Sequence, residues 1–108
     1  MMLTAYTENT PPKFLSSYVT VKYALLGLVK ALAVEYADKG IAVNGVSPEM
    51  ISTKFLRNMP QWVVEKNAAA NPSGRNLAVE DVVPAIKFLL SDEAGQITGQ
   101  NLVITGGR

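Results

Sequence analysis

The sequence predicts an α/β fold built on a parallel sheet of about three strands. Strand-like segments at residues 1–6, 41–48 and 100–105 alternate with helical segments, an order that favours parallel pairing through helical crossovers. The 108 residues, 48% of them hydrophobic, suffice for one domain with a buried core. A parallel sheet needs cover on both faces. With so few helices available, we expect part of the fold to be missing.

The most regular predicted element is a helix over residues 14–40. Ser16 or Ser17 can cap its start, and Gly40 suits the left-handed residue that ends many helices. Large side chains recur at helical spacing along it, namely Leu25, Leu28, Val29, Leu32 and Tyr36. This segment therefore provides the longest helix of the predicted fold.

The second half of the chain continues the alternation. Residues 41–48 predict a buried strand, and residues 52–70 predict one or two short helices that Pro60 divides. Residues 79–90 predict a further helix, with acidic side chains in its first turn, and residues 100–105 predict the last strand. Four side chains of residues 52–70 are expected to cover an apolar surface, namely Phe55, Met59, Trp62 and Val63.

Composition excludes several function classes. The chain has no Cys and no His, so disulfides, the common metal sites and Ser/His/Asp catalysis are not expected. The net charge is +1 without a long charged block, so neither nucleic acid nor a charged membrane surface is an expected partner. Charged residues interrupt the longest apolar stretch, and the N-terminus lacks the pattern of a signal peptide. A cytoplasmic protein is expected.

A tyrosine and a lysine lie four residues apart near the start of the long helix. This spacing places Tyr18 and Lys22 on one face, one turn apart. A neighbouring ammonium group favours the phenolate, so such a tyrosine can donate a proton to a carbonyl oxygen or accept one in the reverse reaction. The same spacing arises by chance in many helices, so by itself it does not identify a catalytic pair.

The pair belongs to a motif, and further motifs follow it along the chain. The run SYVTVKYA begins at Ser17, GIAVNGVSP begins at Gly40, and VITGG begins at Val103. Together with Ile51 and Thr53, these motifs resemble short-chain dehydrogenases/reductases, most closely 3-oxoacyl-(acyl-carrier-protein) reductase. The resemblance implies a Rossmann-like doubly wound parallel sheet. Residues 1–108 would be a single partial domain, the C-terminal part of that sheet, with the N-terminal nucleotide-binding half missing.

The resemblance also implies roles for single residues. Tyr18 would be the catalytic acid/base, and Lys22 would stabilise its phenolate and bind the ribose of NAD or NADP. Tyr18, Pro48, Ile51 and Thr53 would contribute to the cofactor site, with the backbone of Ile51 holding the carboxamide. Structural readings remain open, because Thr53 can simply cap a helix and Pro48 can simply end a strand.

Substrate contacts are implied less specifically. Residues 52–70 would form the substrate flap, in which Met59 and Trp62 either line a substrate pocket or pack the flap onto the core. The family's catalytic serine lies about thirteen positions before the tyrosine, which is Ala5 here. A hydroxyl in its place would come from Thr4 or Thr7.

Two further departures concern the cofactor. Glu49 stands where the family has a glycine after the proline, and the chain contains no Gly-rich phosphate-binding loop. We therefore expect the complete enzyme to use NAD or NADP on a small carbonyl or acyl substrate, and this chain alone to bind neither cofactor and to be inactive. The alternatives are a non-catalytic fragment acting as an oligomerisation or interaction module, or an unrelated α/β module with accidental motifs. A homo-oligomer, dimeric or larger, is expected both for the enzyme and for the non-catalytic fragment.

Overall fold

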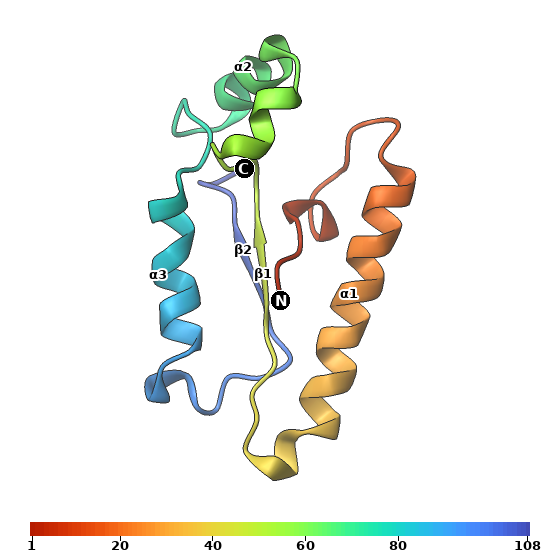
Figure 1. Cartoon of the computed structure of the whole chain (residues 1–108), viewed down its shortest axis with the longest axis vertical. Helices are drawn as coiled ribbons and strands as arrows, with labels where there is room; N and C mark the ends of the chain where they lie inside the picture. Colours follow the sequence, from red (N-terminus) through yellow and green to blue (C-terminus); the bar gives the residue numbers. More distant parts are fainter.

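A computed structural model describes the backbone of residues 1–108 and every side chain except that of Phe55, so the predicted place of Phe55 lies outside the described residues. The strands β1 (Gly45–Pro48) and β2 (Asn101–Ile104) pair in parallel and in register from end to end. Figure 1 shows them at the centre of the molecule, with helices to either side and a further helical segment beyond one end. The predicted α/β class with a parallel sheet is therefore confirmed.

Three α-helices surround the strands. Helices α1 (Ser16–Glu35) and α3 (Val79–Leu89) lie on opposite sides of β1 and β2, and α2 (Gln61–Ala70) lies beyond the carboxyl ends of the strands (Figure 1). A 3-10 helix, η3 (Lys54–Asn58), precedes α2, and Pro60 separates the two. We call residues 52–70, which contain η3 and α2, the flap.

The third predicted strand is much shorter than expected. Residues 1–6 contribute one parallel bridge, between Met2 and Val46, in which the Leu3 N–H donates to the Val46 carbonyl over 2.8 Å. The chain then turns into a 3-10 helix, η1 (Ala5–Thr7), because the Thr7 N–H bonds back to the Thr4 carbonyl. The prediction of about three strands is therefore wrong in extent, since two strands and one bridge are formed.

The strand predicted over residues 41–48 begins only at Gly45. Before that point, side chains replace the regular strand ladder: Val43 N–H donates to Thr98 Oγ1 over 3.0 Å, and Asn44 donates to the Ile97 carbonyl over 2.7 Å. The last strand is likewise shorter than the predicted 100–105, because Gln100 N–H bonds to the Asn44 side chain. Asn44 is thus occupied with backbone groups of its own chain.

The long helix is also shorter than the predicted 14–40. Its N-cap is Leu15, and the predicted cap by Ser16 or Ser17 is wrong, since no side chain caps the helix. Only Val29 and Ala33 are buried along its twenty residues. By length and composition alone, α1 could cross a membrane, but a core helix of a soluble protein passes the same test.

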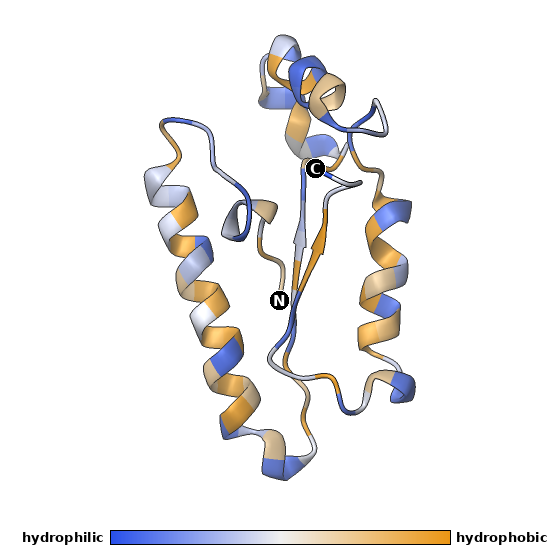
Figure 2. Ribbon diagram, turned by 180° about the vertical axis from the view of Figure 1, so that it is seen from behind, coloured by the Kyte–Doolittle hydropathy of each residue, from blue (hydrophilic) through white to orange (hydrophobic). Residues whose placement is uncertain are grey.

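The core lies between α3 and the strands. Val46, Leu77 and Val82 are buried together, and partly buried apolar side chains from α3, β2 and the loop after β1 pack against them. Figure 2 shows apolar residues in β2 and along α3. This core fixes the carboxyl ends of the strands relative to the loops that follow them.

The start of α3 is held by an ion pair outside this core. Arg75 donates from both terminal nitrogens to the Asp81 carboxylate, over 2.6 and 3.0 Å, and the Ala78 N–H donates to the same carboxylate over 2.7 Å. The Arg75 hydrogen bond first, and then the Ala78 N–H, lower the pKa of Asp81 from 3.8 to about 2. The carboxylate thereby satisfies a free donor at the helix start.

Acidification is expected to weaken this helix start. Since the folded-state pKa of Asp81 is depressed, the stabilisation is complete above about pH 4 and is lost as the pH falls through about 2. NMR titration of the Asp81 carboxyl should give a midpoint of about 2, and Arg75→Gln should move that midpoint towards 3.8. Glu80→Gln serves as the control in the same turn. An Asp81 midpoint unchanged in Arg75→Gln would contradict the assignment.

Candidate active site

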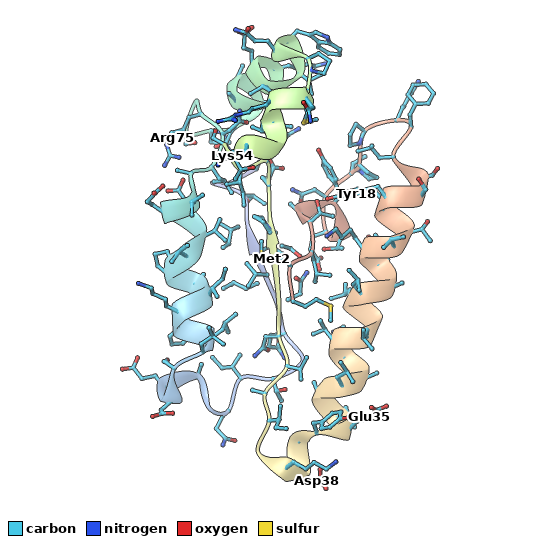
Figure 3. The ribbon with its side chains drawn as sticks, viewed as in Figure 1. Met2, Tyr18, Glu35, Asp38, Lys54 and Arg75 are labelled. Carbon is cyan, nitrogen blue, oxygen red and sulfur yellow. The ribbon has the colours of Figure 1, made fainter. Side chains whose placement is uncertain are left out.

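The candidate site lies at the carboxyl ends of β1 and β2. In open parallel sheets, ligands bind at this end of the strands, where the connecting loops converge. Figure 3 shows Tyr18, at the start of α1, at the same end of the molecule as Lys54 of the flap, while Glu35 and Asp38 lie at the opposite end. The fold thus brings the first turns of α1 and the flap to one region.

The Tyr18/Lys22 pair has the geometry that its spacing predicts. The Lys22 Nζ lies 5.7 Å from the centre of the Tyr18 ring. It also donates a hydrogen bond to the Met2 carbonyl over 3.2 Å, which anchors the ammonium group at the outer edge of the sheet. Tyr18 is 44% exposed, and no hydrogen bond among the described residues uses its hydroxyl. The phenol is therefore accessible to a ligand, beside a fixed positive charge.

Ile51 lies just beyond the end of β1, in a parallel bridge with Leu77. The hydrogen bonds of this bridge run from Leu77 N–H to the Met50 carbonyl, over 3.0 Å, and from Ser52 N–H to the Leu77 carbonyl, over 2.8 Å. Both skip Ile51, so its own N–H and C=O point away from Leu77. No hydrogen bond among the described residues uses either group, and together they offer a paired donor and acceptor to a ligand.

Glu49, which follows Pro48 where the family has a glycine, is buried in the protein. The side chain of Glu49 is 3% exposed, and its Oε2 lies 3.1 Å from the Arg108 Nη1. The same Nη1 donates to Asn67 Oδ1 of α2 over 2.8 Å. Arg108 therefore joins the end of β1 to the flap, and the acidic group at Glu49 is paired within the protein.

Tyr6 lies in η1, between the buried residues Ala5 and Thr7, and η1 packs against both α1 and β1. Burial first, and the Glu49 carboxylate second, raise the pKa of the Tyr6 phenol, while Arg108 opposes them and the Tyr18 phenol adds to them. This second tyrosine is thus close enough to the candidate site to be influenced by its charged groups.

Neither threonine considered as a substitute for the missing serine is freely available. Thr4 and Thr7 are both buried, and Ala5 between them is 1% exposed. The Thr7 hydroxyl donates to the Thr4 carbonyl over 2.9 Å and accepts from the Asn101 amide over 3.3 Å. Thr7 is therefore part of an internal network, and Thr4 has little surface to offer a substrate.

The remaining predicted site residues differ in burial and in whether they line a pocket. Pro48 is buried at the end of β1, opposite Ile104. Thr53 lines a pocket in the flap together with Met59, whereas Trp62 is 65% exposed and is not among the described residues that line it. Thr53 precedes η3 but makes no side-chain cap. The flap pocket thus gathers two of the predicted residues and leaves the third at the surface.

Three residues near the site carried no recognisable signal in the sequence. Tyr6, Asn67 and Arg108 come from separate segments, and their proximity depends on the tertiary fold. Glu49 was recognisable as a departure from a pattern, but nothing in the sequence identified Arg108 as its partner.

Comparisons with known proteins show which proteins the chain resembles. Residues 2–108 match the family described as enoyl-(acyl carrier protein) reductase. Cyclohexanol dehydrogenase of Acinetobacter sp. (strain SE19) is 40% identical over 92 residues, which are 85% of this chain and 36% of that protein. The 3-oxoacyl-[acyl-carrier-protein] reductase FabG of Escherichia coli (strain K12) is 38% identical over 92 residues, which are 85% of this chain and 38% of that protein. The chain therefore spans less than two fifths of the length of these relatives.

Solved structures give the same result. The 3-oxoacyl-[acyl-carrier protein] reductase from Brucella melitensis matches with a TM-score of 0.87 and 25% identity, covering 98% of this chain and 40% of that one. A 4-hydroxyisoleucine dehydrogenase complexed with NADH and succinate matches with a TM-score of 0.79 and 33% identity, covering 98% and 43%. The predicted resemblance and the Rossmann-like class are both confirmed by these matches.

Proposed function

Because this chain belongs to the short-chain dehydrogenase/reductase family, we propose that it carries the acid/base half of an NAD(P)-dependent oxidoreductase that interconverts a carbonyl and an alcohol. One observation carries the proposal: an unbonded, accessible Tyr18 phenol lies beside the anchored ammonium group of Lys22, at the ligand-binding end of a parallel sheet. The relatives named as 3-oxoacyl reductases favour a 3-oxoacyl-like carbonyl as the substrate.

The proposed chemistry uses Tyr18 as the proton donor. A reduced nicotinamide, when bound, supplies the hydride that adds to the carbonyl carbon. The Tyr18 hydroxyl gives its proton to the carbonyl oxygen, which completes the alcohol and leaves a phenolate. Lys22 offsets that negative charge from one helical turn away. In the oxidative direction, the phenolate accepts the proton of the alcohol.

Three features of the chain suit a nicotinamide cofactor. The free N–H and C=O of Ile51 match the acceptor and donor of a carboxamide. Lys22 uses one hydrogen bond on Met2 and retains two donors for ribose hydroxyls. The Glu49 carboxylate is paired with Arg108, so it places no unpaired negative charge after Pro48. Pro48 and Thr53 complete the proposed cofactor contacts.

Asn101 and its partners support this site from inside the protein. Ser47 donates to Asn101 Oδ1 over 2.6 Å, and the Asn101 amide reaches both Thr7 and Glu8, over 3.3 and 3.4 Å. The network ties β2 to β1 and to η1, and we infer that it fixes η1 beneath Tyr18. Breaking this partly buried network would leave polar groups unsatisfied, which is costly.

The second candidate function is a non-catalytic oligomerisation or interaction module. The large exposed apolar surface of α1 favours it, because such a surface in a monomer is a site of association. Association alone does not distinguish the two candidates, since we also expect the proposed enzyme to form a homo-oligomer. We place either form in the cytoplasm, with a small carbonyl or acyl compound as the substrate, and with neither nucleic acid nor a membrane as a partner.

The 108-residue chain alone is expected to show no detectable affinity for NADH or NADPH, because it lacks a Gly-rich loop to receive the pyrophosphate. Calorimetric titration with each dinucleotide is the measurement. The 4-hydroxyisoleucine dehydrogenase, whose structure contains NADH, serves as the positive control under the same conditions. Micromolar binding of either dinucleotide to the isolated chain would overturn this expectation.

A further inference from the structure

We propose that the pocket between η3 and α2 binds an amphipathic chain that carries an anionic group, and that Arg57 holds the anion. The inference rests on the proposed role of residues 52–70 as a substrate flap and names the chemical class of ligand that the flap would take. It concerns equilibrium binding, so its test does not depend on turnover.

The pocket has an apolar floor and a polar rim. Its volume is about 390 Å³, which suits a short chain and a small head group. The half-buried side chains that line it are apolar, namely Leu56, Met59 and Val64. The exposed side chains that line it are polar, namely Ser52, Thr53, Arg57 and Gln61. This division matches a ligand whose apolar part is buried and whose polar end stays near water.

Arg57 provides a positive charge that pairs with no carboxylate among the described residues. Among the described side chains, the ion pairs are those of Arg75 with Asp81 and of Arg108 with Glu49. The one carboxylate of the flap, Glu65, accepts a hydrogen bond from Gln61 Nε2 over 2.6 Å. A guanidinium group binds a carboxylate or a phosphate with two parallel hydrogen bonds, so it is suited to an anionic head group.

The charge of the whole flap supports the same ligand class. Residues 52–70 contain Lys54, Arg57 and Lys66 against Glu65 alone, a net charge of +2, whereas the complete chain carries +1. The rest of the chain is therefore slightly negative, and the net positive charge lies in the flap. A cluster of this sign raises the local concentration of anions. The hydroxyl groups of Ser52 and Thr53 offer further donors at the rim.

The test measures binding of three probes with the same six-carbon chain: hexanoate, hexyl phosphate and hexanol. Amide chemical shifts of residues 52–64 in the 108-residue chain give the Kd, and the indole of Trp62, the single tryptophan, provides a marker on α2. Arg57→Gln is the test variant. Lys66→Gln is the matched control, because it removes one positive charge from the flap at a position outside the described pocket lining.

Both anions are expected to bind with a Kd about tenfold or more below that of hexanol, and Arg57→Gln should remove that advantage, because a charge-assisted hydrogen bond is lost. Lys66→Gln should retain most of it. The preferred anion shows whether a carboxylate or a phosphate ester is the better head group. Equal affinity for hexanol, shifts outside residues 52–64 only, or equal losses in the two variants would each overturn the proposal. Circular dichroism confirms that both variants keep their helices.

Discussion

Replacing Tyr18 with Phe is expected to lower kcat/KM for carbonyl reduction by about 10²–10⁴-fold, the usual contribution of a positioned general acid. In the proposed mechanism the phenol donates the proton, and Phe removes only its oxygen. Because Tyr18 is 44% exposed and makes no hydrogen bond among the described residues, the substitution should leave the fold intact. The assay uses the chain supplied with the nucleotide-binding half of a relative, with either NADH or NADPH.

A matched control for this substitution is available on the same helix. Tyr23→Phe removes the same hydroxyl from another exposed tyrosine, five residues further along α1. It should leave kcat/KM within about twofold, since an exposed hydroxyl away from the site has little effect. Full activity in Tyr18→Phe, with unchanged circular dichroism, would refute the acid/base role. An equal loss in Tyr23→Phe would point to a structural effect on α1.

The order of helices and strands was predictable from the sequence because it depends on local periodicity and on turn residues. The helix spacing of α1 and the short apolar run of β2 are visible over a few residues each. The strand boundaries were less predictable from the sequence. Strand β1 begins at Gly45 because the Val43 N–H bonds to the Thr98 hydroxyl and the Asn44 amide bonds to the Ile97 carbonyl, and those contacts join segments more than fifty positions apart.

In the candidate site, too, local features were predictable from the sequence and long-range contacts were not. Tyr18 and Lys22 are predictable as a pair because one helical turn joins them, and the 5.7 Å separation follows from that spacing. The pairing of Glu49 with Arg108 is not predictable in this way, because it requires the end of β1 to lie beside the chain after β2. The orientation of the Ile51 backbone likewise depends on its bridge to Leu77, which no local pattern marks.

A dimer or larger assembly is the expected state of the isolated 108-residue chain. Its radius of gyration is 15.0 Å, while a compact domain of this length has a value of about 13 Å. Large apolar side chains lie exposed along α1, and Val34 is 80% accessible to solvent. At the sheet edge, the Met2 carbonyl accepts a hydrogen bond only from Lys22 among the described residues. An apolar helix and an open strand edge both favour association.

Light scattering at micromolar concentration is the measurement, and the expected mass is at least twice the monomer mass of 11.6 kDa. Leu28→Glu combined with Val34→Glu should shift the population towards monomer, because charged groups in an apolar contact resist desolvation. Lys30→Glu, which changes an exposed charge on the same helix, should leave the mass unchanged if the apolar face is the contact. A clean monomer of the unmodified chain would show that the apolar surface of α1 does not drive association. An assembly that persists in the double variant would instead point to the strand edge at Met2 as the contact.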